Sequence, residues 1–459
     1  MTRTKQMIFS LSLLLYILTF LPFIEASVVV QAIMSLIIIQ MLWIGGVFPL
    51  AFSSLLLMLL LSVHFFTFKE TLSYFGSEIV WLLFATFILA GAFIESGLAS
   101  RLSLKLLSLS NGSSKKLVFF SFVLMFTLSL FIPSNVGKAG LVSSMLDSIV
   151  KHLQAVGKAS NLAKTLFIGV TLIVPISGAF VATGASSTLY AFGLLGELTS
   201  GLDYVQWFLY MGPPIIVFIL VLYGLFLILF PLEQIDAILL ETVIEEKLRG
   251  LGNMSRAEWK VLFIISLTVL LWMTEGVHGF PVALVALFGA VLTLLPGTGI
   301  WTWEVAGKKV NWDLILFFAA TLMLSNMLIK TGTVQWFASL LTDTLAEDSY
   351  LVVVLLLLGV TALLRLFFVN VLGFLTIILP VAIAIGDAFP AHDPLFLAMG
   401  VFLVGIPGFI LITQSPIHLI SYDYGYFTKR DLLRIGSVAM FFWLGIVLVT
   451  MYGYWMLVY

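Results

Sequence analysis

Long apolar runs recur along almost the whole chain. Stretches such as 7–25, 205–230 and 434–458 hold eighteen or more residues with few charges, and about 20 apolar residues are needed to cross a bilayer as a helix. Hydrophobic residues make up 61% of the 459 residues, and charged residues only 10%. No soluble core of this size needs so much apolar surface, so the sequence predicts an all-α polytopic integral membrane protein.

The sequence excludes several functional classes. A net charge of −1 offers no basic surface for nucleic acid. There are no cysteines, so disulfides, thiolate metal sites and cysteine nucleophiles are excluded. No catalytic pair of acids, His-Glu-x-x-His spacing or Gly-x-Ser-x-Gly elbow is found. We therefore expect neither an enzyme nor a cofactor.

We predict eleven membrane-spanning helices and two re-entrant hairpins, which enter and leave the membrane on one side. The hairpins are the apolar stretches 117–152 and 349–387, each broken midway by polar residues. The first span lies in 1–26, because its apolar run has no signal-peptide cleavage motif. The other spans are placed at 27–45, 47–66, 79–98, 161–195, 205–230, 258–276, 280–296, 312–330, 392–421 and 434–458.

Charge orients this topology. With the N-terminus inside and the C-terminus outside, eighteen of the 22 lysines and arginines, Lys158 among them, fall in inside segments. Only Lys69 and Lys330 fall outside, as the positive-inside rule expects. The remaining two cations, Lys138 and Arg365, lie one in each hairpin. Plasma membrane of the bacterial type is the expected location.

The two halves of the chain resemble each other. FIESG at 93–97 aligns with LIKTG at 328–332, and PSNV at 133–136 aligns with FVNV at 368–371, both at an offset of 235. Five spans and a hairpin in each half make the repeats inverted, an arrangement of transporters whose ligand site lies at the membrane midplane. The predicted domains are repeat 1 at 27–230 (scaffold helices 27–98, hairpin 117–152, transport helices 161–230), an amphipathic inner-surface linker at 231–256, and repeat 2 at 257–459 (scaffold helices 258–330, hairpin 349–387, transport helices 392–458).

The hairpin tips carry the residues best suited to a binding site. The first tip reads FIPSNVGKAG at 131–140, where Pro133 stops one helix and Ser134 or Asn135 can cap the next. The second reads FFVNVLGF at 367–374 and contains Asn370. Helix N-termini that face a common point attract an anion. The alternative is that both breaks are kinks packed against neighbouring helices.

Each half has a second interruption rich in small and hydroxylated residues. In the first half it lies within 173–193 and includes Gly184 and Ala185; in the second it lies within 405–422 and includes Gln414 and Ser415. Such residues also line ordinary helix contacts in membranes. Their place at a break in both halves favours a functional role.

From about residue 40 to the end, the order and spacing of these motifs resemble the divalent-anion:sodium symporter family. Its members carry dicarboxylates, tricarboxylates and sulfate, and the resemblance implies a homodimer with scaffold and mobile transport domains that work as an elevator. The resemblance carries substrate and cation positions onto this chain, and Lys138 is added to them because it lies one turn beyond Asn135, near the first site. The substrate positions are Asn135, Val136, Lys138, Ala185, Arg365, Asn370, Val371, Ser415 and His418; the cation positions are Ser134, Asn135, Gly184, Arg365, Asn370 and Gln414.

The chain departs from the family pattern at these positions. Val136 and Val371 replace the tip threonines, which bind substrate carboxylate in the family, and His418 replaces an asparagine. Arg365 falls where the family has a polar ligand of its second sodium. We therefore expect Lys138 and Arg365 to supply the positive charge that sodium ions give the family.

Three alternatives remain open at the level of sequence. Arg365 could instead pair with a buried acid or cap backbone carbonyls, since a charge in the membrane needs partners. His418 is either a neutral histidine bonded to backbone or a proton-sensitive substrate contact. The predicted function is secondary transport of a small anion, by sodium-independent exchange; sodium-coupled symport, with sodium as coupling ion, and an anion channel are the alternatives.

Overall fold

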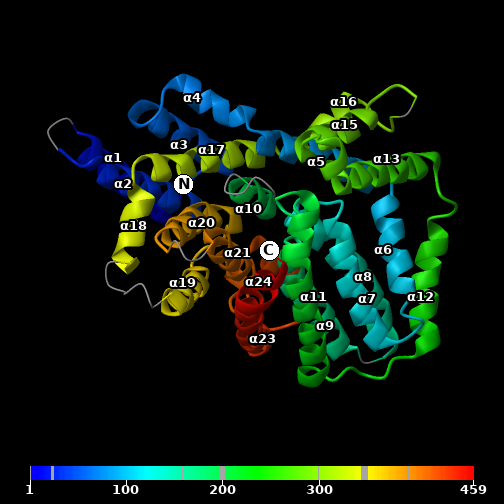
Figure 1. Cartoon of the computed structure of the whole chain (residues 1–459). Coiled ribbons are helices and arrows are strands. Elements are labelled where there is room, and N and C mark those ends of the chain that lie inside the picture. Colours follow the sequence, from blue (N-terminus) through cyan, green and yellow to red (C-terminus); the bar gives the residue numbers. More distant parts are fainter. Residues whose placement is uncertain are drawn as a thin grey trace. The chain divides into compact units, whose positions relative to one another are not determined.

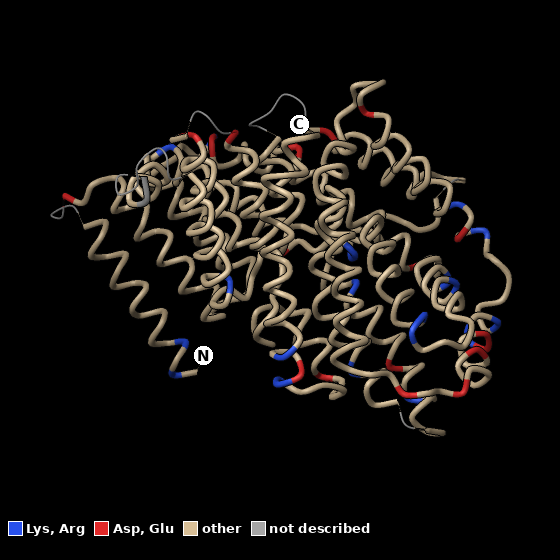
Figure 2. The backbone as a smooth tube through the Cα atoms, turned by 60° about the horizontal axis from the view of Figure 1, so that its bottom comes forward, with Lys and Arg blue, Asp and Glu red and all other residues tan. Residues whose placement is uncertain are grey.

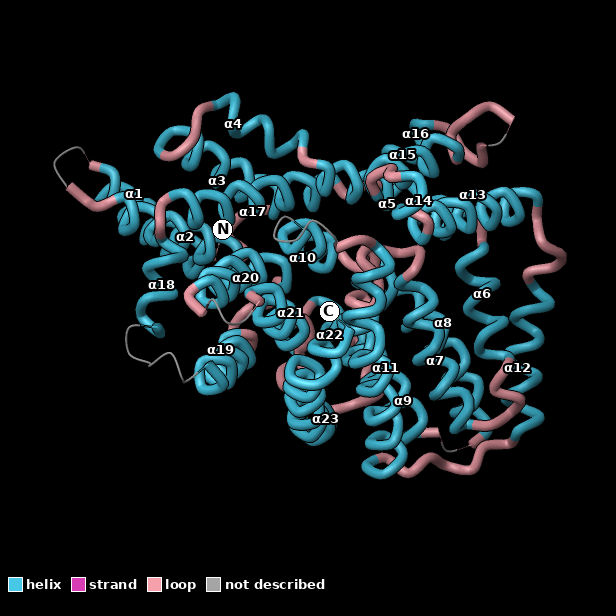
Figure 3. Tube along the Cα trace, viewed as in Figure 1, coloured by secondary structure: helices cyan, strands magenta, loops and turns pink. Residues whose placement is uncertain are grey.

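The computed structural model describes residues 2–21, 25–157, 159–196, 202–297, 299–342, 350–389 and 393–458. All regular secondary structure in these ranges is helical (Figure 3), which confirms the predicted all-α class. Lys158, which was counted for the orientation, and the first residue of the hairpin at 349–387 lie outside the described residues.

The helices follow one another along the chain as labelled in Figure 1. Their bounds are α1 Arg3–Phe20, α2 Val28–Ile44, α3 Leu50–His64, α4 Phe68–Ser73, α5 Glu78–Glu95, α6 Leu98–Ser108, α7 Ser114–Ser129, α8 Asn135–Val156, α9 Ser160–Ser177, α10 Ser186–Gly196, α11 Tyr204–Leu229, α12 Ala237–Gly250, α13 Arg256–Met273, α14 Glu275–His278, α15 Val282–Leu292, α16 Trp303–Ala306, α17 Trp312–Lys330, α18 Thr333–Thr342, α19 Tyr350–Leu364, α20 Val371–Asp387, α21 Pro394–Gly405, α22 Pro416–Tyr422, α23 Lys429–Val449 and α24 Trp455–Val458. Short 3₁₀ turns follow α4 and α16 and precede α22, and a π turn at Thr450–Tyr454 joins α23 to α24.

Both predicted hairpins consist of two helices separated by a short break. The first break runs from Ser129, the end of α7, to Asn135, the start of α8. The second runs from Leu364, the end of α19, to Val371, the start of α20. The polar residues that interrupt the apolar pattern therefore do end and restart the helices.

The second interruption in each half is also a true break. In the first half α9 ends at Ser177 and α10 starts at Ser186, and in the second α21 ends at Gly405 and α22 starts at Pro416. Backbone without helical bonds survives at membrane depth only where protein or water satisfies it. These four breaks are thus the places where partners for exposed peptide groups must be sought.

Helix order repeats between the halves of the chain. The series α5 to α10 recurs as α17 to α22, and α6 and α18 start 235 residues apart, at Leu98 and Thr333. The predicted spans and hairpins include neither of these short helices. Their polar residues interrupt the long apolar pattern that marks a span, although α6 is clearly amphipathic.

Five of the described helices are long and apolar enough to cross a membrane by length and composition. They are Glu78–Glu95, Ser160–Ser177, Tyr204–Leu229, Trp312–Lys330 and Lys429–Val458. Six shorter apolar helices accompany them, including both arms of the second hairpin. This content is that of an integral membrane protein.

The chain forms two compact units, each built from two segments. Unit 1 comprises Met1–Trp81 and Asn311–Gly405, and unit 2 comprises Leu82–Val310 and Ile406–Tyr459. Each unit takes residues from both repeats, so the unit boundaries differ from the repeat boundaries. The division into scaffold and transport domains stays a prediction.

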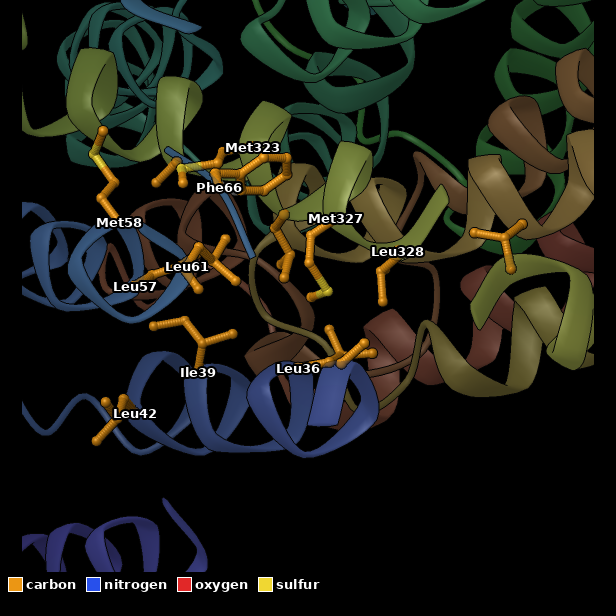
Figure 4. Packing of buried hydrophobic residues seen from close by; sticks show 14 of the residues in the cluster. Leu36, Ile39, Leu42, Leu57, Met58, Leu61, Phe66, Met323, Met327 and Leu328 are labelled. Atoms are coloured by element: carbon orange, nitrogen blue, oxygen red, sulfur yellow. The ribbon is translucent and has the colours of Figure 1, made fainter. Parts of the chain in front are cut away.

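An apolar core holds the helices of unit 1 together. Leu36 of α2, Leu61 of α3 and Met327 of α17 are buried in one cluster, shown in Figure 4. Beside it the ring of Trp43 packs edge-on against Phe317, with 4.7 Å between the ring centroids. This packing fixes α17 and the N-terminal helices as one body, on which the second hairpin rests through α20.

In unit 2 a buried ion pair anchors α6. The Arg101 Nε donates to Glu258 Oε1 at 2.6 Å, and the guanidinium also donates to the carbonyls of Leu251, Gly252 and Asn253. These bonds fasten α6, which leads into the first hairpin, to the turn between α12 and α13.

Candidate functional site

The first hairpin tip starts α8 with a side-chain cap. Ser134 is the N-cap residue, and its Oγ accepts a hydrogen bond from the Gly137 backbone N–H at 3.1 Å. Pro133, just before the cap, has no N–H to satisfy. Because Ser134 caps the start of α8, the side chains of Asn135 and Val136 are not needed for capping. Val136 is 49% exposed, and it is thus the side chain that the tip presents outward.

Lys138 turns back from the first turn of α8 into the interior of unit 2. Its side chain is 0% exposed, and its Nζ donates to Ser129 Oγ at 2.6 Å and to the Gly184 carbonyl at 2.8 Å. Ser129 Oγ in turn donates to Ser177 Oγ at 2.9 Å. Within the described part of the chain no carboxylate pairs with Lys138. Its amino group is therefore held by two neutral oxygens, one at the end of α7 and one within the α9–α10 break.

The α9–α10 break packs tightly against the hairpin tip. A Cβ added to Gly178 would lie 2.8 Å from Asn135 Oδ1 and 2.8 Å from the Ala185 Cβ. The Gly178 carbonyl accepts a bond from Thr188 Oγ1 at 2.7 Å. Asn135 Oδ1 is buried, yet it has no hydrogen-bond partner among the residues with described positions. Asn135 thus retains bonding capacity at the point where tip and break meet.

The residues between α21 and α22 that belong to unit 2 lie close to the start of α22. Ser415 caps this helix by accepting a bond from the Ile417 N–H, and Gln414 Oε1 accepts bonds from the N–H groups of Ile410 and Leu411. His418 Nδ1 lies 2.9 Å from the Leu411 carbonyl. The side chains of Gln414 and His418 thus hold the loop that precedes α22.

The short helix α22 packs against α8 and α9. One direct link is the bond of 2.6 Å between Thr171 Oγ1 on α9 and Ser421 Oγ on α22. Unit 2 therefore brings Asn135, Lys138 and the Gly184 backbone into direct contact and sets the helix that carries Ser415 and His418 against the same elements.

The second hairpin tip lies in unit 1 and is capped by its asparagine. Asn370 Oδ1 accepts bonds from the N–H groups of Leu372 at 3.0 Å and Gly373 at 3.3 Å. The second asparagine thus caps a helix itself, whereas a serine does so in the first tip. A Cβ on Gly373 would be 3.6 Å from Phe317, an ordinary contact. Val371, the first residue of α20, is partly buried.

Arg365 follows the last turn of α19 and caps backbone carbonyls. It is 2% exposed, and its Nε donates to the Gly405 carbonyl, the last residue of α21, at 2.9 Å. Its Nη1 donates to the Phe368 carbonyl within the hairpin break. These bonds match the alternative reading of Arg365 as a carbonyl cap. They also place a fixed positive charge at a helix C-terminus, where cations are favoured.

The predicted site residues are thus divided between the two units. Asn135, Lys138 and Ser415 lie in unit 2, and Arg365 and Asn370 lie in unit 1. The structure describes each half of the predicted site by itself, so the shared midplane site stays a prediction.

Sequence reasoning missed Ser129, whose hydroxyl accepts the bond from Lys138, and Ser177, to which Ser129 donates. Ser129 lies before the break, in a run that reads as ordinary hairpin helix, and Ser177 was one of several serines in a small-residue stretch. The link of these hydroxyls to a buried amine is visible only in the fold, so no sequence signal identifies the two serines. Backbone carbonyls such as Gly184 carry no sequence signal as partners.

No group of three or more histidine, aspartate or glutamate side chains able to hold a metal ion occurs in the described ranges, so a cation there would depend on carbonyl and hydroxyl oxygens.

Apolar spanning helices, paired breaks and polar groups at each break define a polytopic membrane transporter. The sequence matches the family described as the sodium:sulfate symporter transmembrane region over residues 3–459. The chain therefore belongs to this family, which confirms the resemblance to the divalent-anion:sodium symporters. Members of the family are transporters, so the expectation that the chain is not an enzyme is confirmed as well.

Relatives and a solved structure agree with this family. A protein named "Membrane protein" from Cupriavidus necator is 27% identical over 390 residues, which are 83% of this chain and 75% of the relative. The citrate/succinate antiporter of Escherichia coli strain K12 is 23% identical over 382 residues, 81% of this chain and 77% of the relative. The YdaH transporter of Alcanivorax borkumensis shares the fold, with a TM-score of 0.51 and 15% identity, covering 84% of this chain and 88% of that one.

Proposed function

We propose that the chain exchanges small anions of the di- or tricarboxylate or sulfate type across the membrane without sodium. The observation that carries this proposal is the bond from the buried Lys138 ammonium to the Gly184 carbonyl, 2.8 Å long. Gly184 matches a glycine whose backbone helps to hold sodium in the family. In this chain the Gly184 carbonyl oxygen accepts a bond from a lysine side chain instead.

A sodium ion would compete poorly for this place. Two unit charges 4 Å apart repel by about 4 kcal/mol at an effective dielectric constant of about 20. Sodium would also have to replace the Lys138 bonds to Gly184 and Ser129. The tethered ammonium therefore takes the role of the coupling ion.

The surroundings of Lys138 suit an anion. α8 starts at Asn135 and α10 starts at Ser186, so two helix N-termini flank the ammonium. Each N-terminus carries roughly half a positive charge and unpaired N–H groups. In this proposal the substrate positions are those that the sequence predicts: Asn135, Val136, Ala185, Ser415, His418, Asn370 and Val371, with Lys138 and Arg365 supplying charge.

Fixed charge favours exchange over net uptake. A transport domain without substrate would carry an unbalanced positive charge through the membrane, which is unfavourable. An anion bound in each direction removes that imbalance. The Escherichia coli relative is itself named as an antiporter, which supports exchange.

The remaining features of the proposal follow the family resemblance. The chain works as a homodimer in a bacterial plasma membrane, with the N-terminus inside and the C-terminus outside. Scaffold helices stay fixed while the hairpins and the broken helices move as an elevator. A channel needs a continuous polar path, and the valines at the two hairpin tips, Val136 and Val371, disfavour this alternative.

Sodium-coupled symport is the second candidate, and one observation favours it. The bonds of Arg365 to the Gly405 and Phe368 carbonyls give this residue a structural role, so its charge need not replace a second sodium ion. A symporter that uses one sodium ion would then be possible. The family description also names sodium symport.

Uptake into proteoliposomes separates the candidates. Vesicles are loaded with unlabelled succinate, citrate or sulfate, or left empty, and uptake of the labelled anion is measured in sodium or choline buffer. The proposal expects equal uptake in both buffers and a much faster rate when anion is present inside. A steep rise of anion uptake with sodium concentration would identify the protein as a sodium-coupled symporter.

A further inference from the structure

Unit 1 has an apolar groove that transport does not explain. It lies among α1, α2 and α3 and has a volume of about 340 Å³. Ile39, Leu42 and Leu57 form a buried floor, while Leu59 and Val63 stand at the rim, 62% and 64% exposed. Pockets that hold small molecules have volumes of about 300–1,000 Å³. The groove is thus large enough for a ligand.

One polar side chain in the groove lacks a partner. Ser12 of α1 lines the groove and is 3% exposed, and its Oγ makes no hydrogen bond to any described residue. A buried hydroxyl without a partner is unfavourable, because it has lost its bonds to water. Tyr16, the next polar group along the groove, is already bonded through its hydroxyl to His64 Nε2 at 3.2 Å. The groove therefore offers one free donor to an occupant that carries an acceptor.

A cation continues the groove line at the N-terminal end of α1. Lys5 lies four residues before Phe9, so it falls on the same helix face as Phe9 and Ser12. It is partly buried, and its side chain has no ion pair or hydrogen bond within the described ranges. Figure 2 shows the cations at this end of the chain, next to the N-terminus. Arg3, the other cation, falls on a different face and is exposed.

We propose that this groove binds one acyl chain of an anionic glycerophospholipid. The chain fills the apolar floor, the Ser12 hydroxyl donates to an ester carbonyl, and the Lys5 ammonium faces the phosphate. Ser12 and Lys5 are two helical turns apart, about 10 Å along the axis, and the phosphate and ester groups of such a lipid are likewise separated along its length. The charge of Lys5 selects an anionic headgroup.

A second copy of the chain fits the groove less well. A partner helix would bring apolar side chains to the floor and leave the Ser12 hydroxyl and the Lys5 ammonium without partners, whereas a phospholipid supplies both an acceptor and a negative charge. The site depends on neither the transported anion nor the proposed exchange.

The test measures the lipid retained by purified protein. The protein is reconstituted in an equal mixture of phosphatidylglycerol and phosphatidylcholine, extracted in mild detergent, and weighed by native mass spectrometry. Phosphatidylglycerol should remain bound. Leu59→Trp fills the groove from its exposed rim, where misfolding is not expected, and should lower retention about tenfold; Ser12→Phe should do the same from the inside.

Charge is tested with a matched pair. Lys5→Gln should abolish the preference for phosphatidylglycerol over phosphatidylcholine, while Arg3→Gln, with the same loss of charge on another face, should leave it intact. Equal retention in the native chain, Leu59→Trp and Lys5→Gln would overturn the proposal. So would Leu59→Trp that changes the oligomeric state and leaves lipid retention unchanged, because the groove would then be a contact between copies.

Discussion

The Lys138 ammonium lies 2.8 Å from the Gly184 carbonyl oxygen, although 46 residues separate them in the chain. One belongs to the first hairpin and the other to the break between α9 and α10. This bond joins the hairpin tip to the broken helix through a single buried amine, and the proposed sodium independence depends on the charge of that amine.

Removing that charge should create a need for sodium. In Lys138→Ser the Gly184 carbonyl and the Ser129 hydroxyl lose their donor, and leaving such groups buried and unpaired costs about 1–3 kcal/mol each. A sodium ion can then satisfy them. We expect little anion uptake in choline buffer and partial recovery in sodium buffer. Lys105→Ser removes an exposed cation of unit 2 and should behave like the native protein. Sodium-independent uptake by Lys138→Ser would contradict the proposed role.

The close approach at Gly178 predicts a sharp effect of one methyl group. Gly178→Ala would place its Cβ 2.8 Å from Asn135 Oδ1, so the tip must shift, at about 1–3 kcal/mol. We expect a lower thermal midpoint and loss of uptake. The control is Gly140→Ala on α8, where nothing lies within 4 Å. That change should stabilise the helix by about 0.5–1 kcal/mol. Similar midpoints for the two variants would show that the tip is not packed as described.

The two tip asparagines should differ in stability and agree in transport. Asn135→Ala removes a side chain that makes no hydrogen bond to any described residue, so unfolding should be unchanged while uptake is lost. Asn370→Ala removes a helix cap and should cost about 0.5–2 kcal/mol as well. Asn370→Ser keeps a capping oxygen, so it should regain stability without regaining uptake. Asn326→Ala, on an exposed position of α17, is the control. Normal uptake by both alanine variants would remove the asparagines from the site.

Breaking the Arg101–Glu258 ion pair should destabilise unit 2 strongly. Removing one partner of a buried pair costs about 3–5 kcal/mol, because the other charge is left buried. Arg101→Ala should therefore lower the thermal midpoint far more than Arg249→Ala, whose exposed pair with Glu245 is worth about 0–1 kcal/mol. Thermal unfolding in detergent, followed by loss of soluble protein, measures both. Equal midpoints would mean that the α12–α13 turn does not depend on Arg101.

The predicted inversion of the repeats can be tested by labelling. The chain has no cysteines, so a single introduced cysteine reports its own position. Val136→Cys should react with an impermeant maleimide from the inside, and Val369→Cys from the outside; the two valines are 49% and 38% exposed. Membrane vesicles of both orientations provide the measurement. If both cysteines label only from the same side, the repeats are not inverted.

Much of the fold could be predicted because the membrane constrains it. Apolar length marked the spans, and the breaks at Pro133 and near Asn370 were visible because polar residues stand out in such runs. The short helices α6 and α18 were not predicted, since the length and hydropathy of apolar runs do not reveal amphipathic segments. At the site, residue type identified Lys138 and Arg365, but their partners are mostly carbonyls. Every residue has a carbonyl, so only the fold decides which one a cation meets.

The Lys138 amine is covalently part of the protein, and this has a consequence for how the site is loaded. A site that depends on a dissolved ion fills by a collision, so its rate of loading varies with the salt content of the surroundings. A charge held by its own side chain is always present at one equivalent per protomer. The affinity for the anion would then be the same in fresh water and in brine, apart from ordinary screening. The proposed exchange would let a cell import one anion against another in habitats where no sodium gradient is available.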